Sequence, residues 1–241
     1  MPHSPNSCLA TGAGVRVALL DSGVNAQHSH VGVLAGGIGF SVNANGTIQT
    51  TEDYTDRIGH GTALAGILRA KAPHVALYAV KIFSERLATS IIVLEAALRW
   101  AIEQRMHIIN LSLGTANPDH HERMKALVAQ ANTVGTLLVA SSPPGRADML
   151  PAALPGVIGV AGDDQCGWGD HLYIAEDPIP FRAHPCPRPL PGPAQARNFH
   201  GHSFASAHIS ALLALLVENN PTMTVNEVKE YLKQTSRSTA S

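Results

Sequence analysis

The chain has 241 residues, and its 17 Lys and Arg nearly balance 18 Asp and Glu, for a formal net charge of −1. Without a block of like charge, the composition excludes a protein built around an extended nucleic-acid-binding or anionic-membrane-binding surface. The longest apolar runs are too short to span a bilayer, and 45% hydrophobic residues are enough for one large core. We therefore expect a single domain over residues 1–241, with neither nucleic acid nor membrane as a partner.

The cysteines and the first residues bear on the cellular compartment. Cys8, Cys166 and Cys186 are an odd, widely spaced set that fits neither a disulfide framework nor a zinc site. Residues 1–10 lack the basic start and apolar middle of a secretory signal. We expect a reduced, cytoplasmic setting, with a Cys166–Cys186 bridge as the open alternative.

Apolar runs alternate along the chain with stretches that carry apolar residues at helical spacing. Residues 25–58 interrupt this alternation with an irregular segment in which we expect at most short strands. The alternation predicts a doubly wound α/β fold, with a mostly parallel sheet and helices on both faces. The expected strands are 15–20, 75–83, 107–114, 136–140 and 157–161. One expected helix begins at His60, and the others are 90–105, 119–133, 203–218 and 221–234.

Residues 163–198 lose this periodicity. Seven prolines between residues 178 and 193 exclude a helix and disfavour a central strand. We expect a Pro-rich surface excursion that leads to Ser203.

Three residues flanked by small side chains lie at predicted element boundaries. Asp21 follows the first strand, His60 opens a helix, and Ser203 lies where the Pro-rich run meets a long apolar helix. Each alone has a plain structural reading, as a turn former, a helix-entry residue or an N-cap. A serine nucleophile, however, needs an imidazole to take its proton and a carboxylate to hold that imidazole in the right tautomer. Together, in the order Asp, His, Ser, they predict acyl-transfer chemistry.

Five sequence blocks are similar to those of a known family. Leu20–Val24, His60–Gly66 and Gly201–Ser206 resemble the three signature blocks of the subtilisin-like serine peptidases, and Leu77–Lys81 and Asn110–Gly114 resemble auxiliary stretches in the family's order. The resemblance implies a subtilisin-like fold and a serine endopeptidase that works through an acyl-enzyme.

The resemblance also assigns roles to residues. It implies that Asp21 orients the imidazole, that His60 is the general base and acid, and that Ser203 is the nucleophile. A peptide or protein substrate is expected to pair as an extended strand with two edges of the site. The residues of these edges are Ser112, Leu113 and Gly114 on one side and Ala88, Thr89 and Ser90 on the other.

Specificity is expected to depend on a short segment before a proline. Met149-Leu150-Pro151 resembles the family segment that floors the first specificity pocket and holds a cis proline. Met149, where the family usually has a small residue, is expected to fill space and favour a small side chain before the cleaved bond. Ordinary packing is the alternative reading of this methionine.

The sequence departs from the family pattern at the oxyanion hole. By ungapped comparison Pro143 stands where the family supplies an asparagine, and a proline has no donor. The remaining candidates are the backbone N–H of Ser203 and the hydroxyls of Ser141 and Ser142. A second departure is His202, in the place of a threonine, which is expected either on the rim or in contact with substrate.

Two further features shape the expected function. The connection at residues 69–74 is short and carries Arg69 and Lys71, which disfavour a hard cation, so we expect no metal and no cofactor. The first strand begins near residue 15, so we expect no room for a folding pro-domain, and either an intracellular protein or a catalytic module cut from a longer chain. These features resemble a compact processing peptidase that cuts a precursor or leader peptide, with a peptide-binding fold of impaired activity and a general degradative protease as alternatives. Oligomeric state is left open.

Overall fold

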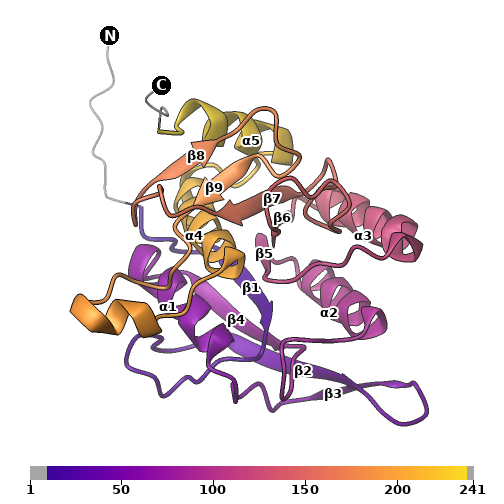
Figure 1. The fold of residues 1–241 in the computed structure, drawn as a ribbon. Helices are drawn as coiled ribbons and strands as arrows, with labels where there is room; N and C mark the ends of the chain where they lie inside the picture. The colour runs from indigo at the N-terminus through magenta and orange to yellow at the C-terminus, as the bar shows by residue number, and fades with distance from the viewer. Residues whose placement is uncertain (1–9, 238–241) are drawn as a thin grey trace.

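A computed structural model describes residues 10–237, so the expectations for the first nine residues, Cys8 included, lie outside it. Its centre is one nine-stranded sheet with the order β3-β2-β4-β1-β5-β6-β7-β9-β8 (Figure 1). Only the β2–β3 and β8–β9 pairs are antiparallel. The strands are β1 (Arg16–Asp21), β2 (Gly36–Val42), β3 (Ile48–Thr51), β4 (Ala76–Lys81), β5 (Ile108–Leu111), β6 (Leu137–Ser141), β7 (Ile158–Gly162), β8 (His171–Tyr173) and β9 (Phe181–Ala183).

Helices cover both faces of this sheet, which confirms the predicted fold class. α1, α4 and α5 share a hydrophobic core with one face, and α2 and α3 pack on the other (Figure 1). Among the described residues, none of the helices is both long enough and apolar enough to cross a membrane. The helices are α1 (His60–Lys71), α2 (Ile91–Glu103), α3 (His121–Thr133), α4 (His202–Asn219) and α5 (Val225–Gln234), with 3₁₀ turns at η1 (Pro118–His120) and η2 (Gly192–Arg197).

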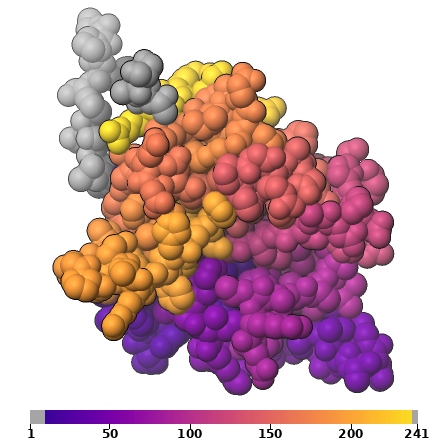
Figure 2. Space-filling model, viewed as in Figure 1, coloured from indigo at the N-terminus to yellow at the C-terminus, as the bar shows by residue number. Residues whose placement is uncertain are grey.

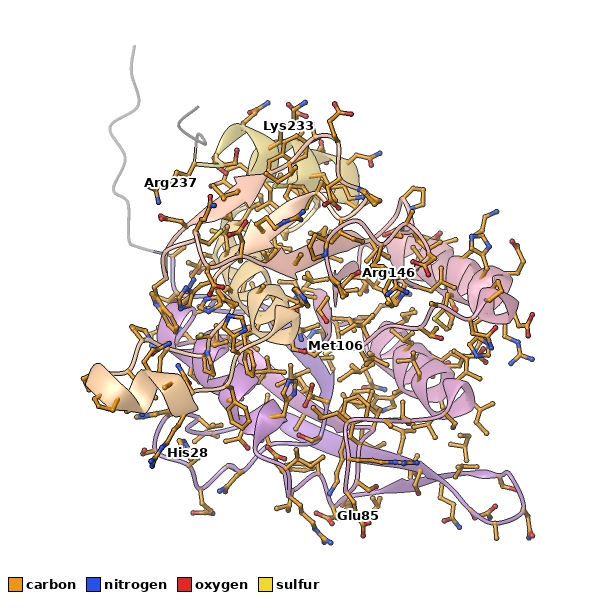
Figure 3. The ribbon with its side chains drawn as sticks, in the orientation of Figure 1. His28, Glu85, Met106, Arg146, Lys233 and Arg237 are labelled. Carbon is orange, nitrogen blue, oxygen red and sulfur yellow. The ribbon has the colours of Figure 1, made fainter. Side chains whose placement is uncertain are left out.

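The apolar content of each central strand follows from burial on both faces. In β1, Val17 and Leu19 pack on the side of α1 and α4, while Ala18 and Leu20 pack against α2. Charged side chains such as Lys233 project from the periphery of the ribbon (Figure 3). Because the central strands are parallel, their carboxyl ends meet at one edge of the sheet.

The prediction of a surface excursion over residues 163–198 is wrong for its middle part. β9 continues the sheet parallel to β7, and β8 forms the outermost strand beside it. Phe181 and Ala183 are fully buried. The prolines allow this because they lie beside the strands: Pro180 precedes β9, and its carbonyl accepts a hydrogen bond from the Ile174 N–H. Residues 188–199 are largely exposed, as expected for an excursion.

A cationic side chain holds the short connection between α1 and β4. The Arg69 guanidinium donates hydrogen bonds to the carbonyl oxygens of Val31, Val33, Pro73 and Val75. The carbonyl oxygens of two loops thus bind the Arg69 guanidinium at the connection between α1 and β4. The expectation that no metal binds stays a prediction, and residues 10–237 contain no cluster of three His, Cys, Asp or Glu side chains suited to a metal ion.

Candidate active site

The three residues proposed for acyl transfer lie at the carboxyl edge of the sheet. Asp21 is the last residue of β1, His60 is the first residue of α1, and Ser203 is the second residue of α4. Both helices pack on the same face of the sheet. The fold therefore brings together elements that are far apart in the sequence.

A buried hydrogen bond joins Asp21 to His60. His60 Nδ1 lies 2.8 Å from Asp21 Oδ1, and the aspartate side chain has no exposed surface. The same oxygen accepts the Ser22 N–H at 2.8 Å and the Ser22 hydroxyl at 3.1 Å. Asp21 Oδ2 has no partner within the described residues. Because the ionised carboxylate only accepts, His60 Nδ1 carries the proton and Nε2 keeps its lone pair for a substrate-side proton.

Two glycines make this close approach possible. A Cβ at Gly61 would lie 2.1 Å from the Gly23 carbonyl oxygen and 3.2 Å from Asp21 Oδ1. A Cβ at Gly23, where φ is +93°, would lie 2.2 Å from the Tyr54 carbonyl oxygen. The small residues that flank Asp21 and His60 in the sequence are thus required by backbone contact between β1, α1 and the loop at Tyr54.

Asp56 positions the turn that carries His60, and sequence reasoning missed it. Its carboxylate accepts hydrogen bonds from the N–H groups of Ile58, Gly59 and Thr62 and from the Thr62 hydroxyl. Burial raises the pKa of Asp56, but these hydrogen bonds outweigh it and hold the pKa below its usual value. An acidic residue just before a helix start is the signal that could have found this cap.

The Ser203 hydroxyl at the start of α4 is bonded to the backbone that follows β5. Ser203 Oγ donates to the Ser112 carbonyl oxygen at 3.3 Å, and residues 10–237 show no hydrogen bond between Ser203 and His60 Nε2. The ring of the next residue, Phe204, is 5.2 Å from the His60 ring, centroid to centroid. The long bond to Ser112 is weak, and a rotation about χ1 redirects the hydroxyl; hydrogen bonds of this kind commonly tighten only when substrate binds.

The candidate oxyanion donors differ in availability. The backbone N–H of Ser203 belongs to the first turn of α4, where no preceding turn supplies an acceptor. The Ser142 hydroxyl is occupied, because it donates to the Pro143 carbonyl at 2.8 Å. Ser141 ends β6 at the same sheet edge and is 6% exposed, and none of the hydrogen bonds within residues 10–237 involves its hydroxyl. Of the two serines, Ser141 thus keeps the free donor.

The first predicted substrate edge is held by a buried polar network. The Ser210 hydroxyl of α4 donates to Asn110 Oδ1 at 2.9 Å, and Asn110 Nδ2 donates to Ser112 Oγ at 2.9 Å. Leu113 is half-buried and Gly114 is exposed, so the backbone after β5 is accessible. The network fixes Ser112 relative to the helix that carries Ser203.

Met149 lies against this edge. A Cβ at Gly114 would be 2.8 Å from Met149 Sδ, and Thr115 pairs with Leu150 as an antiparallel bridge. The Leu150–Pro151 peptide bond is cis, as the resemblance implied. The second predicted edge, Ala88–Ser90, is an accessible extended segment before α2, and the structure gives it no hydrogen bond to the other site residues among those described.

His202 connects the α4 terminus to the sheet. Its Nδ1 accepts the Gly162 N–H at 2.9 Å, and burial, with the nearby His200 and Arg182, lowers the pKa of His202. The imidazole is therefore a neutral acceptor that anchors the end of β7. This structural contact was not expected from the sequence, and the two expected roles of His202, on the rim or in contact with substrate, stay predictions.

The two described cysteines are free and buried. Burial raises the pKa of the Cys166 thiol to about 12 and also raises that of Cys186. The alternative of a Cys166–Cys186 bridge is thus not realised, and neither thiol is poised as a nucleophile.

The fold and the site define an α/β protein that carries an aspartate, a histidine and a serine at the carboxyl edge of a parallel sheet. The model of the Subtilase family matches residues 12–166 and 186–241. The chain belongs to the subtilase family. The unmatched residues 167–185 contain β8 and β9.

Several known proteins resemble the chain over most of its length. It is 31% identical over 243 residues to the thermostable alkaline protease of Halalkalibacterium halodurans, which covers 93% of this chain and 63% of that protein. It is 29% identical to subtilisin Savinase of Lederbergia lenta over 249 residues, or 96% and 86% of the two chains. A cold-adapted subtilisin-like serine proteinase shares the fold with a TM-score of 0.69 at 17% identity, over 97% of this chain and 86% of that one. The chain thus spans less than two thirds of the alkaline protease.

Proposed function

We propose that the protein is a serine endopeptidase that uses Asp21, His60 and Ser203 as a catalytic triad. The observation that carries this proposal is the buried 2.8 Å hydrogen bond between Asp21 and His60 beside a serine at a helix N-terminus. It fixes the His60 tautomer that a general base requires. The names of the similar proteases support the same reaction class.

In this mechanism Ser203 Oγ attacks the carbonyl carbon of the cleaved peptide bond while His60 Nε2 takes its proton. His60 then donates that proton to the leaving amine, which yields an acyl-enzyme and releases the C-terminal part of the substrate. Water, deprotonated by His60, hydrolyses the ester. Asp21 stabilises the imidazolium in both steps, because its charge lies buried against Nδ1.

The negative oxygen of the tetrahedral intermediate is proposed to bind the Ser203 N–H and the Ser141 hydroxyl. A missing oxyanion donor typically costs about 2.7–4 kcal/mol of transition-state stabilisation. A serine hydroxyl can rotate away where an asparagine amide is held in plane, so we expect slow turnover. Slow chemistry suits an enzyme whose substrate is presented to it.

The substrate is proposed to be a peptide bound as an extended strand between Ser112–Gly114 and Ala88–Ser90. Both segments have accessible backbone beside the site. We propose a dedicated processing role on a precursor or leader peptide, in a cytoplasmic setting. Two buried, unpaired thiols are compatible with a reducing compartment.

An active-site serine probe tests the proposed reaction. A fluorophosphonate should label the wild-type protein and fail to label Ser203→Ala, because only a serine activated by an imidazole attacks phosphorus at a useful rate. Ser236→Ala is the matched control, since the hydroxyl of this half-buried serine bonds only the Lys233 carbonyl among the described residues. No labelling together with retained peptide binding would favour the peptide-binding alternative, and broad casein hydrolysis would favour a degradative protease.

Met149 is proposed to limit the side chain before the cleaved bond. Its sulfur already contacts the backbone at Gly114, so we expect cleavage after Ala to exceed cleavage after Phe. Met149→Gly should reverse this order by roughly tenfold in kcat/KM, because a few methylenes of pocket space are worth about 1–3 kcal/mol. A peptide series that varies only this residue gives the measurement. Equal rates after Ala and Phe in the wild type would make Met149 ordinary packing.

A further inference from the structure

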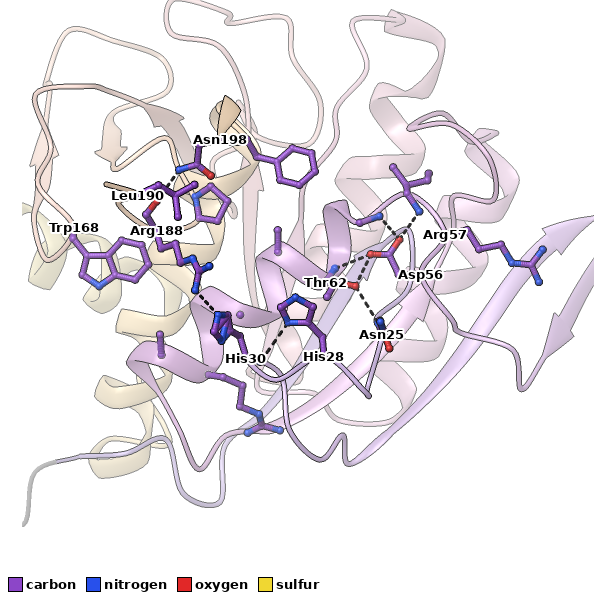
Figure 4. Close-up of a pocket in the computed structure, with 18 residues that line it drawn as sticks. Asn25, His28, His30, Asp56, Arg57, Thr62, Trp168, Arg188, Leu190 and Asn198 are labelled. Atoms are coloured by element: carbon purple, nitrogen blue, oxygen red, sulfur yellow. Dashed lines mark hydrogen bonds between the residues drawn. The ribbon is translucent and has the colours of Figure 1, made fainter. Parts of the chain in front are cut away.

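A cavity of about 770 Å³ opens next to the proposed catalytic histidine. One wall is the outer side of α1 and the other is the segment 187–199, which reaches across from the far end of the sheet (Figure 4). In the space-filling view this segment, coloured orange, lies against the indigo surface of the N-terminal part of the chain (Figure 2). The proposed mechanism leaves this cavity without a role.

The cavity begins at the catalytic residues. Gly59, which precedes His60, and Phe199, four residues before Ser203, both line it. The Phe199 ring is 6.4 Å from the His60 ring and stacks on Phe204 at 5.7 Å. Ser112, which follows β5, contacts Ser203, whereas Phe199 lies against Gly59 at the start of α1. A peptide chain that pairs with Ser112–Gly114 and passes Ser203 therefore runs toward the cavity with the residues after the cleaved bond.

The middle of the cavity presents hydrogen-bond donors. His28, His30 and Arg188 converge there (Figure 4). Arg188 Nη1 donates to the ring nitrogen Nε2 of His30. The backbone N–H of His30 donates to the ring nitrogen Nδ1 of His28 at 3.3 Å. An imidazole that accepts at one nitrogen carries its proton on the other. The groups left over are thus His30 Nδ1–H, His28 Nε2–H and the remaining guanidinium N–H groups of Arg188, all of which donate.

The charged side chains around His28, His30 and Arg188 leave a positive charge that can bind an anion. Within residues 10–237 no carboxylate pairs with Arg188, whose one side-chain hydrogen bond is the one to His30. Asp56 also lines the cavity, but its two oxygens are occupied by the α1 turn. Arg57 points away from the cavity (Figure 4) and pairs with Asp53 at 3.3 Å. Arg69 also lines the cavity, but its guanidinium is bound to four carbonyl oxygens, so Arg188 is the exposed cation that remains for a ligand.

The distance from the reacting centre sets the position of such a ligand. His30 lies over α1 at Gly66, where a Cβ would be 3.8 Å from the His30 Cβ. Six residues of helix separate Gly66 from His60, or about 9 Å at 1.5 Å per residue. An extended peptide rises about 3.3 Å per residue, so this span is about three residues long. Apolar walls at Phe199, Leu190 and Trp168 flank the path.

We propose that this cavity binds the leaving part of the substrate and selects an acidic side chain, Asp or Glu, at the third or fourth residue after the cleaved bond. The carboxylate binds Arg188 together with the free N–H groups of His30 and His28, and an adjacent apolar side chain packs against Phe199 or Leu190. The direction of the peptide rests on the proposed function. The cavity thereby adds a charge-based selection that the strand pairing at Ser112–Gly114 does not provide.

Internally quenched peptides with an amidated C-terminus test this selection. The amide removes the terminal carboxylate, so that only a side chain can supply the anion. Each peptide carries Glu, Gln or Lys at one of the first five positions after the cleaved bond. In the wild type, Glu at the third or fourth position should raise kcat/KM about tenfold over Gln, as expected for a partly exposed charged hydrogen bond. Arg188→Gln should abolish the preference, and Arg188→Glu should reverse it toward Lys.

Arg197→Gln is the matched control, because Arg197 is an exposed arginine of η2 that does not line the cavity. It should keep the preference and hydrolyse the Gln peptides at the wild-type rate. Hydrolysis of Glu and Gln peptides at equal rates would overturn the acidic selection and leave the proposed reaction intact. Fluorescence anisotropy of the same peptides with Ser203→Ala measures binding without turnover. Tighter binding of the Glu peptides that depends on Arg188 upholds the selection even where hydrolysis is absent. Equal binding of Glu and Gln peptides overturns it.

Discussion

Replacing His60 with alanine is expected to lower kcat by about 10⁶-fold, because loss of the general base disables the serine and the histidine as one unit. His60 is 6% exposed, and the only hydrogen bond of its side chain among residues 10–237 is the one to Asp21. We therefore expect His60→Ala to lower kcat. KM should change little, because a peptide that pairs as a strand does so with other residues. Stopped assays with an internally quenched peptide give both constants.

Asp21, the hydrogen-bond partner of His60, is expected to contribute less to kcat than His60 does. Asp21→Asn keeps an oxygen acceptor for Ser22 and His60 but removes the buried charge, and a loss of about 10⁴-fold is expected. His74→Ala, at an exposed histidine, should leave kcat unchanged. If His60→Ala retained more than a few per cent of the wild-type rate, the triad assignment would be wrong.

Asp177→Ala is expected to reduce the free energy of unfolding by about 3–5 kcal/mol, because it leaves a buried guanidinium without its counter-charge. Asp177 Oδ2 lies 2.6 Å from Arg182 Nη2, and the two side chains are 15% and 6% exposed. The same carboxylate also accepts the N–H groups of Gly145 and Ile179. It thus ties β9 to the loop after β6, and chemical denaturation at pH 7 measures the loss.

The matched control is the exposed pair Arg146–Asp148, 2.7 Å apart, where Asp148→Ala should cost under about 1 kcal/mol. Burial raises the pKa of Asp177, but the bonds from Gly145 and Ile179 and the charge of Arg182 outweigh it, so the pKa lies below its usual value. A lowered folded-state pKa gives stability that is present above the unfolded value, about 3.9, and is lost as the pH falls through the folded value. The difference between wild type and Asp177→Ala should therefore shrink in acid; a difference that stays constant below pH 4 would contradict the ion pair as its cause.

Local sequence determined the elements that carry the proposed catalytic residues. Asp21, His60 and Ser203 each end or begin an element with small neighbours, and the fold places all three at one sheet edge. Such boundaries can be read from a short window because strand and helix periodicity are local properties. The glycines beside Asp21 and His60 are informative for the same reason: they mark where two backbones approach within contact distance.

Tertiary structure alone decided the features that join distant segments. A Pro-rich stretch without periodicity contains two strands, because β7 and Asp177 supply the pairing edge and the charge that Phe181–Ala183 lack by themselves. The donor cluster of the cavity joins His30 to Arg188, 158 residues apart, and neither residue has a neighbour in sequence that predicts the other. A short sequence pattern records what a residue requires of its own backbone. Which charges and donors meet depends on how the helices and loops pack over the sheet, and for this protein that packing determines the shape and charge of the space beside His60.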